Sequence, residues 1–197
     1  REMIADGLFE QFPCDEIFGM HNNPNGKPGK MDICKGAAMA AAAFFDIDIV
    51  GVGSHAAMPQ SSKDTVVIAS ALIAQLQTIV SRNVPPLDSC VLSVTQIHAG
   101  TAYNVVPETA KLCGTIRYFK DDVYETARTR METLCKGLAE AYGVEIKLDA
   151  RNVFDVLNND CELSDAYLEA AADIVGVENV SGEAAPATGS EDFADML

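Results

Sequence analysis

The feature that most constrains the fold is a repeated change of hydrophobic period between residues 44 and 150. Phe45, Ile47 and Ile49 alternate with acidic residues, which predicts a strand. Apolar residues then recur at helical spacing behind Asp64, a typical helix N-cap. The predicted elements are, in order, a strand at 45–49, a helix at 64–80, strands at 90–97 and 110–119, a helix at 121–142 and a strand at 144–149.

This order, β-α-β-β-α-β, is that of the split βαβ or ferredoxin-like arrangement, in which two helices cover one face of a four-stranded sheet. We therefore predict an α/β chain with a self-contained ferredoxin-like domain at 38–152. The flanks at 1–37 and 153–197 are predicted to be two pieces of another domain, which the ferredoxin-like domain interrupts.

Local patterns predict the elements of the flanks. Residues 1–12 resemble the end of a helix capped by Gly7, with Phe12 packed beneath the turn. A short, mostly apolar strand is expected at 16–21, and a loop rich in Gly, Pro and Lys at 24–36. A helix is expected at 162–175.

Composition argues against some classes of partner. The formal charge of −15 would repel phosphate backbones, so nucleic acid is not an expected partner. No apolar run reaches the roughly 18–20 residues of a membrane span, and no signal peptide is visible. Six cysteines without a Cys-x-x-Cys pair suggest a reducing, cytoplasmic location.

His21 is the first candidate for chemistry. It lies in Gly-Met-His-Asn-Asn-Pro, at the end of the strand predicted at 16–21. Ligands in α/β folds bind at the carboxyl ends of strands, and neutral imidazole is a common metal ligand. The alternative is a histidine that only hydrogen-bonds the following Asn-rich turn.

His55 is the second candidate. It lies in Gly-Val-Gly-Ser-His-Ala-Ala-Met-Pro, where glycines allow a sharp turn that presents the imidazole. From such a loop the ring can donate a hydrogen bond to a developing oxyanion. A turn histidine without function is the alternative.

Arg117 is predicted on the polar face of its strand, where its guanidinium can grip a carboxylate in bidentate fashion. Asn104, in the loop before that strand, can share the task. The alternatives are a surface salt bridge for Arg117 and a turn for Asn104. His98 is interpreted as structural.

Glu191 and Asp192 follow Gly189-Ser190 near the end of the chain. Adjacent acids after such a turn can bind a metal ion. They also fit the first turn of a helix capped by Ser190, which is the favoured interpretation.

Taken together, these motifs resemble the di-metal aminoacylase–carboxypeptidase metallopeptidases, in particular the branch of hippurate hydrolase and the N-acyl-amino-acid amidohydrolases. The resemblance runs through nearly the whole chain. It includes, besides the motifs of His21 and His55, Leu76-Gln-Thr-Ile-Val-Ser-Arg-Asn, Ser93-Val-Thr-Gln-Ile-His-Ala-Gly, and the series Asn104…Pro107…Gly114-Thr-Ile-Arg117.

The resemblance implies a ferredoxin-like lid and dimerisation domain inserted in a zinc-peptidase-like α/β catalytic domain, of which the flanks are parts. His21 would bind metal, and His55 would reach the active site of a neighbouring subunit. Asn104 and Arg117 would hold the substrate carboxylate. Two divalent ions, zinc or manganese, would serve hydrolysis of N-acyl amino acids or small peptides by a homodimer.

The resemblance also implies metal ligands and a general-base glutamate outside residues 1–197, so we expect the chain alone to be inactive. Ser54 replaces a usual glycine, and Gln60 replaces a histidine that often follows the proline. The alternative class is a non-catalytic module for dimerisation or for binding a small ligand.

Overall fold

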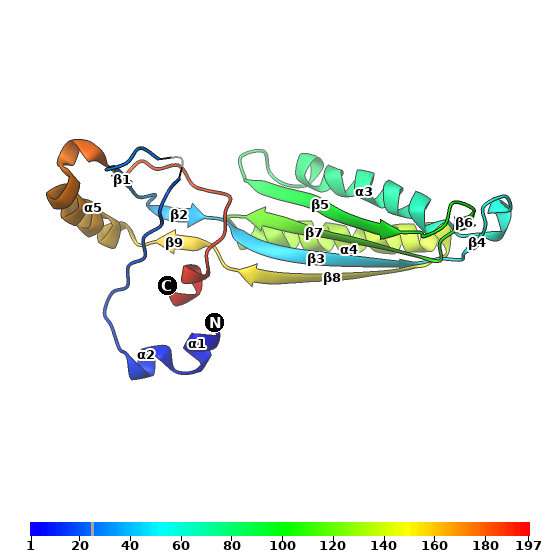
Figure 1. Cartoon of the computed structure of the whole chain (residues 1–197), viewed down its shortest axis with the longest axis horizontal. Coiled ribbons are helices and arrows are strands. Elements are labelled where there is room, and N and C mark those ends of the chain that lie inside the picture. Colours follow the sequence, from blue (N-terminus) through cyan, green and yellow to red (C-terminus); the bar gives the residue numbers. More distant parts are fainter. Residues whose placement is uncertain (25) are drawn as a thin grey trace. The chain divides into compact units, whose positions relative to one another are not determined.

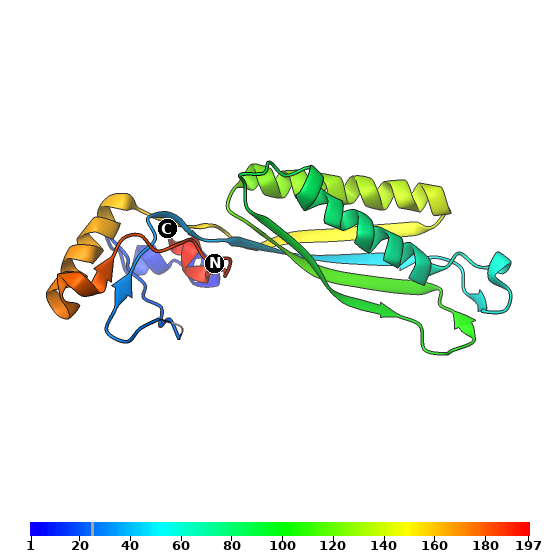
Figure 2. The ribbon, with the colours of Figure 1, turned by 90° about the horizontal axis from the view of Figure 1, so that it is seen from above.

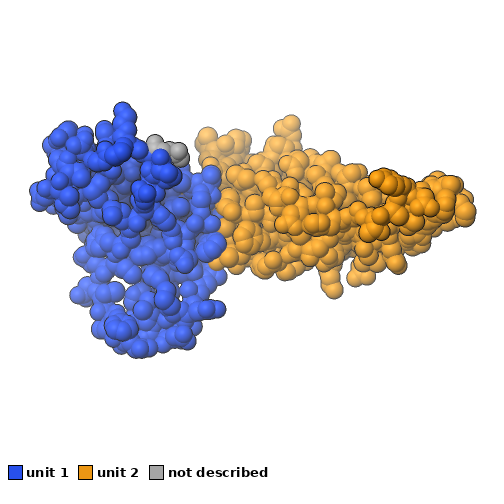
Figure 3. Space-filling view, in the orientation of Figure 1, with its two compact units in different colours: residues 1–41, 154–197 blue, residues 42–153 orange. Residues whose placement is uncertain are grey.

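The computed structural model describes residues 1–24 and 26–197; Asn25, in the loop predicted at 24–36, lies outside the described residues. The chain divides into two compact units (Figure 3). Unit 1 consists of Arg1–Ala41 and Phe154–Leu197, and unit 2 of Ala42–Val153. These divisions fall within a few residues of the boundaries drawn from the sequence at 37/38 and 152/153.

Unit 2 is built on a four-stranded sheet in the order β5-β7-β3-β8. Adjacent strands run in opposite directions (Figure 1), and α3 and α4 cover the same face of the sheet (Figure 2). The predicted ferredoxin-like α/β arrangement is therefore confirmed. The elements are β3 (Ala41–Val50), α3 (Thr65–Arg82), β5 (Cys90–Ala99), β7 (Thr109–Tyr118), α4 (Asp121–Tyr142) and β8 (Glu145–Phe154).

The core of unit 2 lies between the sheet and the two helices. Phe45, Ile47 and Ile49 of β3 are almost completely buried, as their alternation with polar residues predicts. The buried stripes of α3 and α4 face them, and each fully buried large side chain contributes about 1.5–3 kcal/mol. These helical residues are Ile68, Leu72, Leu76 and Ile79 of α3, and Val123, Ala127, Met131 and Leu138 of α4.

Both helices of unit 2 have the ends that the sequence predicts. The Asp64 carboxylate accepts hydrogen bonds from the backbone amides of Val66 and Val67, at 2.9 and 3.2 Å. Gly143 ends α4 in the left-handed conformation, with φ of 62°. By length and mean hydropathy, 1.4 over 18 residues, α3 would also suit a membrane span, but its apolar stripe is buried as in a core helix.

The opposite face of the sheet carries charges. Asp46 accepts from Arg151 Nη1 at 2.8 Å and from Lys111 Nζ and Cys113 Sγ at 3.1 Å each. The Arg151 hydrogen bond, followed by those from Cys113 and Lys111, holds the pKa of Asp46 far below its ordinary value. One face of the sheet is therefore apolar and the other is a network of ion pairs.

Apart from one longer helix, unit 1 is made of short elements. Strand β1 (Met31–Asp32) pairs in parallel with β10 (Val180–Ser181), and β2 (Gly36–Met39) pairs antiparallel with β9 (Leu157–Asn159). The predicted helix at 162–175 is present as α5 (Cys161–Val175), with Asp160 accepting from the amides of Glu162 and Leu163. Strands of two to four residues are too short to show a clear periodicity, which is why the sequence does not predict them.

One prediction for the first flank is confirmed and two are wrong. Helix α1 (Glu2–Ala5) ends just before Gly7, which adopts φ of 84° as the predicted cap requires, and a second short helix, α2 (Leu8–Gln11), follows. Phe12, expected to pack beneath the turn, is exposed. The expected strand at 16–21 is irregular backbone, and Phe18 and Met20 are exposed. An apolar run forms a strand only where a neighbouring strand pairs with its backbone groups, and none of the described strands does so.

Two glycines test the packing of unit 2. A Cβ at Gly114 of β7 would lie 2.2 Å from Cζ of Phe45 and 2.3 Å from the Ser93 carbonyl oxygen, whereas a Cβ at Gly137 of α4 would meet no atom within 4 Å. We expect Gly114→Ala to lower the free energy of unfolding by about 1–3 kcal/mol through overpacking. Gly137→Ala should raise it by about 0.5–1 kcal/mol.

Urea unfolding of both variants, followed by circular dichroism, checks this pair. Equal stability of Gly114→Ala and the unmodified chain would contradict the close approach of β7 to the core.

Candidate functional site

The Gly-Ser-Glu-Asp-Phe motif of unit 1 is held beside β2. The amide of Ala187 donates to the Ala38 carbonyl at 2.9 Å, and the Ala40 amide donates to the Ala187 carbonyl at 3.0 Å. The chain then enters a short 3-10 helix, η3 (Asp192–Met196). Its cap is Glu191, whose Oε1 accepts from the Phe193 amide at 3.2 Å, so the predicted cap at Ser190 is wrong by one residue.

The motif that contains His21 meets this segment. His21 Nε2 contacts Glu191 Oε2, and Gly19 lies against the Phe193 ring, where a Cβ would be 3.5 Å from the ring carbons. The His21 side chain is exposed and that of Glu191 is 17% exposed. A purely structural His21 is expected to be packed and isolated. The observed His21 is instead exposed and paired with a carboxylate.

The sequence allows Glu191 to be a metal ligand or part of a helix cap, and it does not predict the contact with His21. The only hint in the sequence is that His21 and Glu191 each follow a glycine by two residues, in separate motifs. One carboxylate oxygen of Glu191 caps η3 and the other contacts His21. The hydrogen bond from His21 is the largest cause that lowers the pKa of Glu191, and partial burial opposes it.

An imidazole nitrogen and a carboxylate oxygen are donors that zinc and manganese accept. Metal-binding histidines are also commonly held in place by a carboxylate on the other ring nitrogen. Within residues 1–24 and 26–197, no group of three His, Cys, Asp or Glu side chains is arranged to hold an ion. His21 and Glu191 therefore fit part of a metal site rather than a whole one.

Strand β4 (Ser54–His55) pairs antiparallel with β6 (Val105–Val106), and the two strands lie at one end of unit 2 (Figure 1). Asn104 directly precedes β6, and its carbonyl accepts from the Ala56 amide at 2.9 Å, so His55 and Asn104 are neighbours. Gly51, just before β4, lets the backbone pass close to Lys63, because a Cβ at this position would lie 2.2 Å from the Lys63 carbonyl oxygen. His55 and Asn104 are both exposed.

Arg117 lies on the predicted face of β7, near the end of that strand. It stands opposite Val91 of β5, and its guanidinium carbon is 6.0 Å from the centre of the Phe44 ring. Its Nη1 donates to the Thr115 hydroxyl and, at 3.2 Å, to the Ile116 carbonyl. These contacts fix the side chain on the polar face of the sheet.

The length of β7 separates the two groups expected to hold one carboxylate. Asn104 precedes β7, which runs from Thr109 to Tyr118. Eight residue steps from Thr109 to Arg117, at about 3.4 Å each, amount to roughly 27 Å. Asn104 and Arg117 of one chain therefore lie too far apart to grip the same small carboxylate, and the expectation that both bind it would need residues of two chains. Their individual roles stay predictions.

His98, interpreted from the sequence as structural, is exposed on β5 and its Nε2 lies 3.0 Å from Gln96 Oε1. Among the described residues, its side chain shares no hydrogen bond with the other candidate residues.

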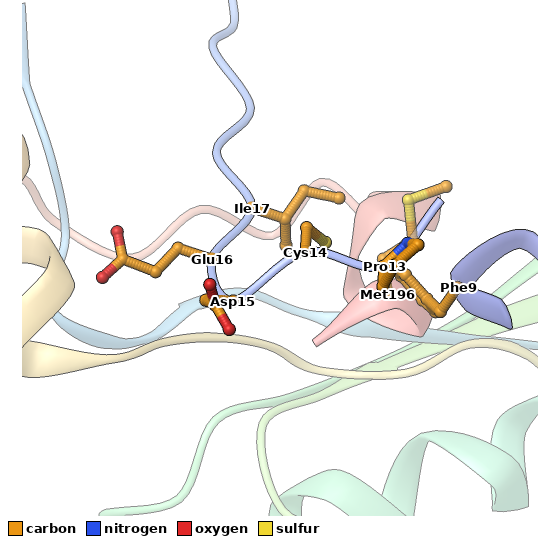
Figure 4. A pocket seen from close by; sticks show the side chains of 7 residues that line it. All are labelled: Phe9, Pro13, Cys14, Asp15, Glu16, Ile17 and Met196. Carbon is orange, nitrogen blue, oxygen red and sulfur yellow. The ribbon is translucent and has the colours of Figure 1, made fainter. Parts of the chain in front are cut away.

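A shallow hollow of about 310 Å³ lies in unit 1. Figure 4 shows Phe9, Pro13 and Met196 grouped on one side of it and the carboxylates of Asp15 and Glu16 on the other. Neither His21 nor Glu191 lines this hollow, so it is separate from the candidate metal-binding pair.

Comparison with known proteins defines the family. The profile of the peptidase dimerisation domain, M20 type, matches residues 40–143. Hippurate hydrolase of Campylobacter jejuni is 38% identical over 193 residues, which cover 98% of this chain and 50% of the relative. An N-acetyldiaminopimelate deacetylase of Limosilactobacillus fermentum is 36% identical, covering 97% of this chain and 50% of that protein.

Among solved structures, a dinuclear metal-binding peptidase of the M20 family from Bacillus subtilis superimposes with a TM-score of 0.76 at 27% identity. The match covers all of this chain and 48% of that one. The fold and motifs thus define a member of a metallopeptidase class, and the chain belongs to the M20 peptidase family. It spans about half the length of the curated relatives it matches.

The pairing of His21 with Glu191 predicts a pH effect. Because the pKa of Glu191 is lower in the folded chain than in the unfolded one, its carboxylate stabilises the fold at neutral pH. This contribution is lost as the pH falls below about 4.3, the ordinary glutamate value, and through the folded-state pKa. His21→Ala should raise the pKa of Glu191, as followed by NMR titration of the side-chain carboxyl carbon.

His98→Ala is the matched control, since it removes an exposed histidine from unit 2, and it should leave the Glu191 titration unchanged. Identical titration of Glu191 in His21→Ala and the unmodified chain would show that the pair does not form in solution.

Proposed function

We propose that the complete protein is a metal-dependent amidohydrolase that cleaves the amide bond of N-acyl amino acids or small peptides. The observation that carries the proposal is the contact of His21 with Glu191, two side chains of types that can bind a metal ion, from distant motifs. The relatives support it, since they are named as a hippurate hydrolase and as deacetylases of N-acetylated amino acids.

His21 would be a metal ligand, and Glu191 would hold its ring or neighbour the ion. The ions proposed are two divalent cations, zinc or manganese, with further ligands from the rest of the complete protein. When bound, such ions supply an activated water and polarise the carbonyl group.

His55 would act on the oxygen of the scissile carbonyl. As the amide carbon becomes tetrahedral, negative charge collects on that oxygen, and a ring N–H aimed at it stabilises the transition state more than the substrate. The exposed position of His55 at the end of unit 2 suits a group that completes a site outside its own unit.

Arg117 would hold the carboxylate of the substrate through charge-assisted hydrogen bonds. Its contacts with Thr115 and Phe44 support this role, because a guanidinium already fixed in place loses little conformational entropy on binding. Asn104, beside His55, would contact the reacting end of the substrate.

We further propose that the protein works as a homodimer. The separation of His55 and Asn104 from Arg117 along β7 supports an arrangement in which the His55 end of one copy completes the site of the other. The matched family domain is itself described as a dimerisation domain. A cytoplasmic location stays a prediction from the cysteine pattern.

A non-catalytic dimerisation or ligand-binding module is the alternative. It would need only unit 2 and would leave His21 without a chemical partner. The contact between His21 and Glu191 in unit 1 favours the enzyme.

Kinetics of the complete protein separate these roles. His55→Ala should lower kcat by about 100- to 1,000-fold, as expected for loss of an oxyanion donor. Arg117→Ala should raise KM for an N-acyl amino acid by about 10- to 100-fold, because two charge-assisted hydrogen bonds are lost. His98→Ala is the control and should change neither constant.

Steady-state hydrolysis of N-benzoyl and N-acetyl amino acids gives both constants. An unchanged KM in Arg117→Ala would remove it from carboxylate binding, and an unchanged kcat in His55→Ala would remove that residue from the chemistry.

A further inference from the structure

The turn that carries His55 is closed by its own backbone. Three consecutive amides, of residues 56, 57 and 58, each have an acceptor. The Ala56 amide donates to the Asn104 carbonyl at 2.9 Å, and the Met58 amide donates to the His55 carbonyl at 2.8 Å. The amide between them, of Ala57, donates to Nδ1 of the His55 ring at 3.1 Å.

The last of these bonds decides where the imidazole carries its proton. A backbone amide can only donate, so the nitrogen that receives its hydrogen must present a lone pair. Nδ1 of His55 is therefore unprotonated in this turn, and a neutral ring must carry its hydrogen on Nε2. The turn selects one of the two tautomers.

The Ser54 side chain also contacts this turn. Its hydroxyl lies 3.2 Å from the His55 carbonyl oxygen and 3.3 Å from the Met58 carbonyl oxygen, so its single hydrogen is shared between the two ends of the turn. Ser54 is half-buried, whereas His55 and Met58 are exposed. A glycine at this position would make neither contact.

We propose that Ser54 is a positioning residue that, together with the Ala57 amide, holds His55 as the Nε2–H tautomer with that hydrogen free for a ligand. The hydroxyl keeps the carbonyls of residues 55 and 58 in place, and this keeps the Ala57 amide aligned with Nδ1. The ring then presents a donor without first rotating or exchanging its proton.

The effect of this tautomer on catalysis rests on the proposed function, but the selection of the tautomer itself does not. If Nε2–H faces the carbonyl oxygen of a substrate, it can donate as negative charge develops there. The other tautomer would direct a lone pair at that oxygen and repel it. Selection of the tautomer before the substrate arrives is a form of preorganisation.

The direct test is NMR on the 197-residue chain labelled with nitrogen-15, at a mildly alkaline pH. We expect one pure tautomer, with Nε2 protonated, and a scalar coupling across the hydrogen bond between the Ala57 amide nitrogen and Nδ1 of His55. A histidine in water exchanges between both tautomers, so averaged ring shifts without the coupling would overturn the proposal.

Variants at Ser54 test its part. Ser54→Ala should shift the ring signals toward the averaged values and weaken the coupling, whereas Ser54→Thr keeps a hydroxyl and should restore both. Ser62→Ala is the matched control, because the Ser62 hydroxyl donates to the Pro59 carbonyl at 2.8 Å in the next turn and, within residues 1–24 and 26–197, shares no hydrogen bond with His55 or Met58. Circular dichroism confirms that each variant is folded.

In the complete protein, Ser54→Ala should lower kcat about threefold to tenfold at unchanged KM, and Ser54→Thr should recover it. A raised KM at unchanged kcat would contradict a role through His55. If the pure tautomer is found but His55→Ala keeps full activity, the proposed function fails while the structural inference stands.

Discussion

The apolar face of the four-stranded sheet in unit 2 is the constraint on which the other features depend. Phe45, Ile47 and Ile49 are buried beneath α3 and α4, and a slip of one residue would turn them to the charged face. The same packing fixes the register of β7, because the Phe45 ring fits against β7 only at Gly114, which has no side chain. The packing thus sets which face carries Arg117 and how far that residue lies from His55.

The length of β7 separates two groups of residues that are proposed to act on one substrate. His55 and Asn104 share one end of unit 2, while Arg117 lies roughly 27 Å along the strand. A rigid sheet does not bring such distant groups to one small substrate. A second copy of the chain, as proposed above, can do so. His21 and Glu191, in unit 1, form the other part of the proposed site.

Long periodic elements were predictable from the sequence, since burial on one side imposes period 2 on β3 and period 3.6 on α3. The strand expected at 16–21 shows the limit of that reasoning, because periodicity does not reveal whether a pairing strand exists. The contact of His21 with Glu191 joins residues 170 positions apart, and no local pattern encodes it. The cap of η3 was misplaced by one residue because both Ser190 and Glu191 have side chains that accept from a backbone amide.

The most direct test of the central claim is subunit complementation in the complete protein. His55→Ala and Arg117→Ala are each prepared alone, then mixed, dissociated and reassociated, and assayed below saturation. If the His55 end of one copy completes the site of the other, mixed dimers regain one intact site, and the mixture should recover about a quarter of the unmodified activity. Activity no higher than the average of the two separate variants would contradict the account.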